Sequence, residues 1–139
     1  VVVCRECRRV LFRSPTSMGD VSEAFDFVAV TDCGLSNVCA MKADVTDQNY
    51  NVGTGTRTSL KELAELLLEI TGCDKPINYV ERSHATLVRN RVGDPKLASK
   101  EIGFTATLGL REGLERLIDW RSKHKAEVER RRREVGIVD

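Results

Sequence analysis

The sequence has no apolar run that approaches the roughly 20 residues of a membrane-spanning helix. The sequence also lacks a large excess of charge of either sign, because 22 basic and 21 acidic residues leave a formal charge of +1. No overall field therefore draws the protein to nucleic acid or to an anionic membrane. Residues 1–14 lack the charged-then-apolar plan of a secretory signal peptide. We expect a cytoplasmic protein with neither a nucleic-acid nor a membrane partner.

A second pair of metal ligands is absent too. The five cysteines are an odd number without framework spacing, which argues against a secreted disulfide scaffold. Cys4 and Cys7 form a single C-x-x-C, and a structural zinc site needs two further ligands at matching spacing. No second C-x-x-C and no H-x-x-x-H occurs, so we expect no metal site. Cys33 and Cys39 fall on an expected helix, where they are interpreted as small core residues.

Residues 1–18 differ in character from the rest and are left unassigned. They combine an apolar triplet with a basic cluster and show no helical or strand periodicity. The stretch RRVLFRS, residues 8–14, resembles a translated sequencing-adapter end. Two interpretations stay open for residues 1–14: an assembly artefact joined to a genuine reading frame, or an ordinary strand with basic flanks.

From Phe25 onward, expected strands alternate with expected helices, which predicts an α/β fold. Ser59 and Glu62 form a capping-box pattern, and Gly72 closes the helix that follows it. The expected strands span residues 25–30, 48–53 and 76–81, and the expected helices span residues 31–43, 58–72 and 110–136.

Two expected helices carry apolar side chains at helical spacing. Residues 31–43 place Leu35, Val38, Cys39 and Met41 on an apolar stripe, which predicts a core-facing side. In residues 110–136 the stripe ends at Trp120 and contains Leu110, Leu114, Leu117 and Ile118. Between these helices, Asp94 and Pro95 begin a short helix after an arginine-rich loop of residues 82–93.

The segment NYNVGTGTRTS contains two glycines, Gly53 and Gly55, before a helix. A dinucleotide-binding fingerprint needs a third glycine, and Thr58 takes its place, although Asp74 lies near the distance of the ribose-binding acid. The favoured interpretation is a strand-to-helix turn in which both glycines supply unusual backbone angles and Ser59 caps the helix. We therefore expect no cofactor-binding residue in this loop.

Four segments together resemble a known family: FDFVAVTDCGLSNVCAMKA, YNVGTGTRTSLKELAELL, RNRVGDPKLASKEIGF and LREGLERLIDW. In order and spacing they are similar to the C-terminal half of extended short-chain dehydrogenases. These are the NAD-dependent epimerases and dehydratases of sugar nucleotides, of which the UDP-glucose 4-epimerases are the best known. The resemblance covers residues 19–125, and residues 126–139 form a basic helical tail beyond it.

The resemblance implies that the chain is a substrate-binding portion with a few short strands and helices, whose Rossmann domain is missing. In the family that domain carries the NAD loop and a Tyr-x-x-x-Lys pair, and it commonly forms homodimers. Tyr50 is followed four positions later by Thr54, and Tyr79 by Ser83. We therefore expect no catalytic residue and no NAD binding in this chain, and no turnover from it alone.

Arg82, Arg89 and Arg91 are the candidate site residues. Related enzymes place an arginine before the short helix, where it contacts the diphosphate of a nucleotide sugar, and Arg91 matches that position best. Planar guanidinium groups suit this task because they bind two phosphate oxygens at once. The sequence departs from the family at Phe25 and Ala29, where an arginine and a tyrosine or histidine are common. The alternative for the three arginines is a solvated basic loop.

Other polar residues carry less weight. Nothing places His84 or His124 near a reacting proton, so surface positions are expected for both. Asp26 and Asp32 do not have the spacing of a catalytic carboxylate pair. The basic tail lacks interleaved aromatic residues, which favours a solvated helix over a nucleic-acid site.

A second hypothesis for the whole chain is a stand-alone, non-catalytic binding module that uses the basic loop or the tail. The two hypotheses differ in what they predict for the surface. Exposed Leu, Val and Ile side chains on the helices would indicate a portion of a larger protein, because a self-sufficient module covers them.

Overall fold

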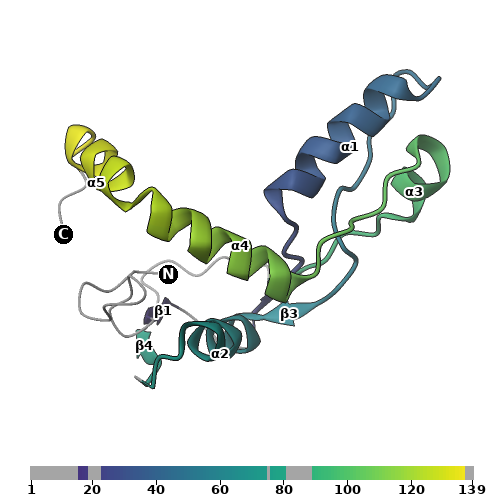
Figure 1. Cartoon of the computed structure of the whole chain (residues 1–139). Helices are drawn as coiled ribbons and strands as arrows, with labels where there is room; N and C mark the ends of the chain where they lie inside the picture. Colours follow the sequence, from purple (N-terminus) through teal and green to yellow (C-terminus); the bar gives the residue numbers. More distant parts are fainter. Residues whose placement is uncertain (1–15, 19–22, 75, 81–88, 137–139) are drawn as a thin grey trace.

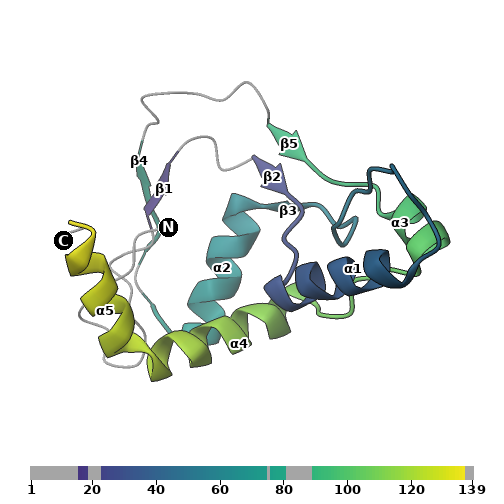
Figure 2. The same ribbon diagram turned by 90° about the horizontal axis from the view of Figure 1, so that it is seen from above.

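The computed structural model describes residues 16–18, 23–74, 76–80 and 89–136. Over these residues the fold is α/β, with short strands and helices of 7 to 14 residues (Figures 1 and 2). The elements in order are β1 (Thr16–Met18), β2 (Ala24–Phe25), α1 (Val30–Lys42), β3 (Thr58–Ser59), α2 (Leu60–Thr71), β4 (Asn78–Val80), β5 (Asn90–Arg91), α3 (Lys96–Ile102), α4 (Leu110–Lys123) and α5 (Lys125–Glu134).

The strands form two small sheets. In the first, the order is β3-β2-β5, with β2 antiparallel to β3 and parallel to β5. In the second, β1 pairs with β4 in parallel. Phe25 is paired with Thr58 on one side and with Arg91 on the other. Directly paired residues project to the same face of a sheet, so these three side chains share a face.

The prediction for α2 is confirmed at both ends. Glu62 N donates to Ser59 Oγ at 3.1 Å, and Ser59 N donates to the Glu62 carboxylate at 2.6 Å, which completes the capping box. At the other end, Gly72 adopts φ 62°, ψ 30°, a left-handed conformation that glycine reaches without strain. Local sequence alone therefore defines this helix.

The bounds of α1 agree with the expected helix, but its expected core-facing side is wrong. Leu35, Val38 and Met41 are exposed, whereas Asp32 and Ser36 are buried. Of the expected stripe, Cys39 alone packs on the core. The helix is therefore turned so that polar and small side chains face inward.

The core lies between α1, α3 and the segment after α3. Phe104 is completely buried and packs with Ala98 and Ile102 of α3. Partly buried side chains around this group are Cys39, Ala43, Val45, Tyr50 and Ala106. Burying apolar side chains in this way is the main favourable term in folding. It joins α1 to α3, which lie side by side in Figure 2.

Two of the three expected strands are largely wrong. Of residues 25–30, Phe25 alone is in a strand, because Asp26 turns away to bind a distant loop and Val30 begins α1. Residues 48–53 form no strand with any other described residue. The third expectation is confirmed over Asn78–Val80. The expected loop of residues 82–93 contains β5, and its residues 82–88 lie outside the described part.

The single long helix expected over residues 110–136 is also wrong, because it is broken at His124. There φ is −105° and ψ 18°, so α4 ends and α5 begins. The His124 ring stacks on Trp120 with centroids 4.8 Å apart. Its Nδ1 lies 2.8 Å from the Trp120 carbonyl oxygen. No described helix is long and apolar enough to cross a membrane.

The start of α3 differs by one residue from its prediction. Pro95, not Asp94, occupies the N-cap position. Asp94 still acts at this end, because its Oδ1 accepts a hydrogen bond from Lys96 N at 3.1 Å. A proline here loses nothing, since the first N–H groups of a helix have no partner within it.

Candidate functional site

Arg91 lies on β5, a strand at the edge of the three-stranded sheet, and Arg89 directly precedes the first residue of that strand. Their carbonyl oxygens accept hydrogen bonds from Ala24 N and Asp26 N, each at 2.9 Å. The main chain is thus fixed while both side chains are exposed. Residues two apart in an extended strand project to the same side. The two guanidinium groups therefore share the face of the sheet that Phe25 and Thr58 occupy. Arg82 lies outside the described residues.

A third arginine, Arg57, reaches the same strand from the far side of β2. Its Nε donates to Asn90 Oδ1 at 3.2 Å. This residue was not among the sequence candidates, because 33 positions separate it from Asn90 and no local pattern joins them. Positive charge at this end of the sheet thus comes from two separate segments of the chain.

The glycine turn encloses one of the chain's own carboxylates. Asp26 accepts hydrogen bonds from Thr54 N, Gly55 N and Thr54 Oγ1 at 3.0, 2.9 and 2.6 Å. Gly55 has φ +72°, as expected of a turn glycine. The expectation of an unusual angle at Gly53 is wrong: glycine is needed there because a Cβ would collide with the Asp26 carboxylate. N–H groups that could cradle a phosphate are therefore already used.

Asp32 holds a second loop in the same manner. Its carboxylate is 2% exposed and accepts from Thr107 N, Thr107 Oγ1 and Leu108 N at 3.1, 2.9 and 3.0 Å. Burial by itself would raise the pKa of Asp32. The hydrogen bonds from Leu108 and Thr107, with the nearby charge of Arg116, outweigh that effect and hold the pKa below its ordinary value. Asp32 is therefore an ionised anchor.

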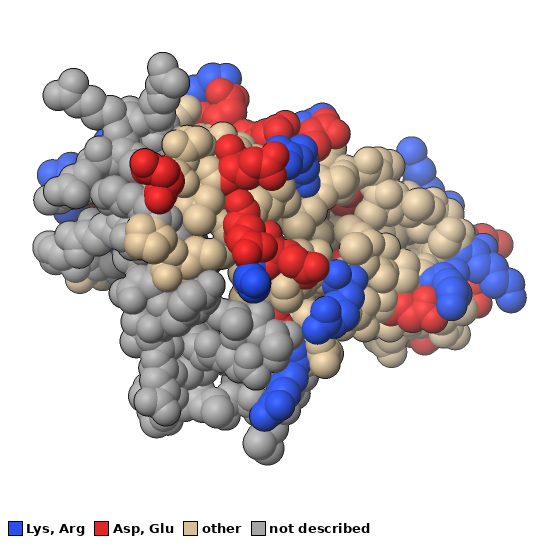
Figure 3. Space-filling model, turned by 90° about the horizontal axis from the view of Figure 1, so that it is seen from below, with Lys and Arg blue, Asp and Glu red and all other residues tan. Residues whose placement is uncertain are grey.

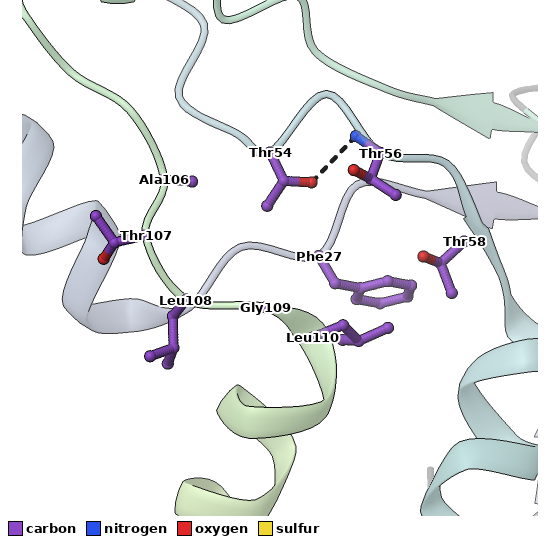
Figure 4. Close-up of a pocket in the computed structure, with 9 residues that line it drawn as sticks. All are labelled: Phe27, Thr54, Thr56, Thr58, Ala106, Thr107, Leu108, Gly109 and Leu110. Carbon is purple, nitrogen blue, oxygen red and sulfur yellow. Dashed lines mark hydrogen bonds between the residues drawn. The ribbon is translucent and has the colours of Figure 1, made fainter.

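A cavity of about 260 Å³ lies between the two anchored loops. Figure 4 shows Phe27 and Leu110 among the central residues, with Thr54 and Thr56 of the glycine turn on one side. No lining residue is formally charged; they are Phe27, Thr54, Thr56, Thr58, Ala106, Thr107, Leu108, Gly109 and Leu110. Such a lining suits an uncharged group that offers both hydroxyls and apolar surface.

The aromatic pair Phe25 and Phe27 connects the cavity to the arginine face. Their rings meet edge to face with centroids 6.2 Å apart. Phe25 lies beside Arg91 in the sheet, and Phe27 lines the cavity. The arrangement can therefore hold an anionic group at the arginines and an uncharged group beside it.

Of the two histidines, the one that the structure describes does not join this site. His124 lies at the junction of α4 and α5, and His84 is outside the described residues. No group of three or more His, Cys, Asp or Glu side chains that could hold a metal occurs within the described ranges. On the face seen in Figure 3, acidic side chains form a band with lysine and arginine side chains at its border. The charge of that face is thus mixed in sign.

Comparison with known proteins gives a consistent result, although no family model matches the chain. UDP-glucose 4-epimerase of Mus musculus is 29% identical over 102 residues, which cover 71% of this chain and 29% of the mouse protein. The crystal structure of UDP-glucose 4-epimerase from Thermotoga maritima with UDP-glucose superposes with a TM-score of 0.76 at 30% identity. It covers 86% of this chain and 37% of the other.

The Bordetella bronchiseptica enzyme WbmF, solved in complex with NAD⁺ and UDP, is similar at TM-score 0.70 and 27% identity. The match covers 82% of this chain and 33% of that enzyme. The chain spans about a third of the length of the relatives it matches, consistent with their C-terminal part.

Proposed function

We propose that the chain, which is similar to UDP-glucose 4-epimerases, is the substrate-side portion of an NAD-dependent epimerase or dehydratase of this kind and contributes the binding of a nucleotide-diphosphate sugar. One observation carries the proposal: the paired exposed arginines, Arg89 and Arg91, share a face with the aromatic residue that leads to the cavity. Arg82 is proposed for the same task from the sequence.

The chemistry of a diphosphate fits this face. A guanidinium group donates two parallel hydrogen bonds to phosphate oxygens and keeps its charge at every physiological pH. Each charge-assisted hydrogen bond contributes roughly 1.5–3 kcal/mol. Hydrogen bonds to β2 fix the main chain at Arg89 and Arg91. Because this backbone is already ordered, less conformational entropy is lost when the arginines bind a ligand.

The residues present do not fit NAD. The N–H groups of Thr54 and Gly55 are occupied by Asp26, and Thr58 stands where a third glycine would let the helix approach. Among the described residues Tyr50 donates to Glu101 Oε2 at 2.8 Å. Partial burial and this bond raise the pKa of Tyr50, which is the opposite of what a catalytic base requires. We propose that NAD and the catalytic pair belong to the rest of the parent enzyme.

Calorimetric titration of the chain with UDP tests the proposal. We expect heat on adding UDP, and an affinity lowered about 10-fold or more by Arg91→Ala and by Arg89→Ala, as loss of one charged contact implies. Arg130→Ala is the control, because Arg130 is an exposed arginine that pairs with Glu134 within α5. Unchanged UDP affinity in both the Arg89 and the Arg91 variant, or no UDP heat from the folded chain, would contradict the proposal.

The stand-alone module is less well supported. Val30, Val38 and Met41 of α1 are exposed. Exposed apolar side chains on a helix favour a portion of a larger protein, because a self-sufficient module would cover them. A homodimeric parent and a cytoplasmic location stay predictions from the family resemblance and the composition.

A further inference from the structure

Arg57 connects two parts of the site that are far apart in the sequence. Its Nε donates to Asn90 Oδ1 at 3.2 Å, and the strand β2 runs between the two residues. Its charge also acts on Glu62 in the first turn of α2: hydrogen bonds from Ser59 are the main cause that lowers the pKa of Glu62, and attraction to Arg57 adds to it. Arg57 therefore lies between the start of α2 and strand β5.

Asn90 is placed to accept this bond by the alternation of side chains along β5. It stands between Arg89 and Arg91, and its side chain projects to the opposite face of the sheet from theirs. Its neighbour on β2 is Ala24, which is fully buried and has only a methyl group. A long side chain can therefore cross β2 above Ala24 and reach Asn90.

Strand β5 is short and lies at the edge of its sheet, so an additional tie affects how firmly it is held. It contains two residues, and both are exposed. Its main chain is bonded to β2, where the amides of Ala24 and Asp26 donate to the carbonyl oxygens of Arg89 and Arg91. Pairs of so few parallel residues are weak. The bond between Arg57 and Asn90 adds a side-chain tie that starts on the other side of β2.

We propose that Arg57 is a positioning residue, which holds β5 through Asn90 so that Arg89 and Arg91 present their guanidinium groups together to the diphosphate. The inference rests on the proposed function, since it concerns the same two arginines. Two guanidinium groups bind one diphosphate well only when their spacing is kept, and hydrogen bonds behind the binding residues keep it. The competing role for Arg57 is a direct contact with the diphosphate.

Amide hydrogen exchange measures the hold on β5 without any ligand. Asn90→Leu keeps the approximate volume of the side chain and removes the acceptor, whereas Asn90→Asp keeps both the size and an acceptor. Exchange at the amides of Ala24 and Asp26, which donate to β5, reports how firmly the strand is held. We expect it to be about 3- to 10-fold faster in Asn90→Leu and in Arg57→Gln, as loss of one hydrogen bond implies, and as slow as in wild type in Asn90→Asp. The amide of Leu60, which bonds to the residue before β2, should be unchanged.

Calorimetric titration with UDP measures the consequence for binding. We expect Asn90→Leu, which changes no formal charge, to lower the UDP affinity about 3- to 10-fold. In that background Arg57→Gln should lower the affinity by no more than about 2-fold further, because two residues that act through one bond are not additive. Asn37→Leu is the matched control, since Asn37 is an exposed asparagine with a hydrogen bond to the Cys33 carbonyl within α1. It should leave the UDP affinity unchanged.

Unchanged exchange at both amides in Asn90→Leu and in Arg57→Gln would overturn the proposal. A wild-type UDP affinity in Asn90→Leu, or an equal loss in Asn37→Leu, would also overturn it. A large additional loss from Arg57→Gln in the Asn90→Leu background would show a direct contact with the ligand instead. Absence of UDP binding by the wild type would contradict the proposed function, whereas the exchange rates would still decide whether Arg57 and Asn90 hold β5.

Discussion

Asp26 and Asp32 each bind one loop through two successive backbone N–H groups and one threonine hydroxyl. The Asp26 carboxylate accepts hydrogen bonds from the N–H and hydroxyl of Thr54 and from the N–H of Gly55. The Asp32 carboxylate accepts them from the N–H and hydroxyl of Thr107 and from the N–H of Leu108. The two aspartates lie six positions apart, on either side of the turn into α1. They therefore position both walls of the cavity, although neither side chain lines it.

Replacing Asp32 with Asn is predicted to lower the free energy of unfolding by about 1–3 kcal/mol, because a buried ionised acceptor with three donors is lost. The pKa of Asp32 is lowered in the folded state, so its contribution is full above the ordinary aspartate pKa of about 3.9 and is lost as pH falls further. Urea denaturation at pH 7 and at pH 3 measures both effects. Wild type and variant should differ less at the lower pH.

Asp119→Asn serves as the matched control for Asp32. Asp119 forms an exposed ion pair with Lys123, and such pairs contribute little. Equal destabilisation by the two substitutions would contradict the claim that the Asp32 carboxylate anchors its loop. The sequence could not reveal either aspartate, because their loops lie 28 and 75 positions away.

At the scale of elements, helices with local signals were predictable, whereas of the three expected strands only that over Asn78–Val80 was. Ser59, Glu62 and Gly72 define α2 within its own sequence. A strand depends on a neighbour, and residues 48–53 have none among the described residues, so a correct local pattern predicted an element that does not form. The face of α1 was wrong for a related reason: its apolar stripe does not pack on the core formed by these residues. The last helix is broken at His124, where no proline or glycine in the sequence predicts a break.

Ser59→Ala is predicted to lower the free energy of unfolding by about 1 kcal/mol, the usual cost of losing an N-cap. Hydrogen bonds from Ser59 lower the pKa of Glu62, so the capping box is complete above the ordinary glutamate pKa and weakens as acid protonates Glu62. Urea denaturation of wild type and variant at neutral pH checks the magnitude. Ser122→Ala, which removes one exposed bond to the Asp119 carbonyl, should change little, and an equal loss there would argue against the capping box.

At the scale of the whole molecule, the described residues divide into an arginine-bearing sheet and a helix whose apolar side is uncovered. The first matches the proposed task of holding a nucleotide-diphosphate sugar. The exposed apolar side of α1 agrees with a chain that spans about a third of the length of its relatives. The family and the α/β class could be predicted because four motifs keep their order over most of the chain. The cavity could not, because its lining comes from three separate segments.

The most direct test of the central claim is to locate UDP on the chain by nuclear magnetic resonance. Backbone amide signals are followed as UDP is added to isotope-labelled protein. The account predicts the largest shifts at residues 89–91, with smaller shifts at Phe25 and Phe27, and none in α5. Shifts confined to the basic residues of α5, or no shifts from a folded sample, would contradict it.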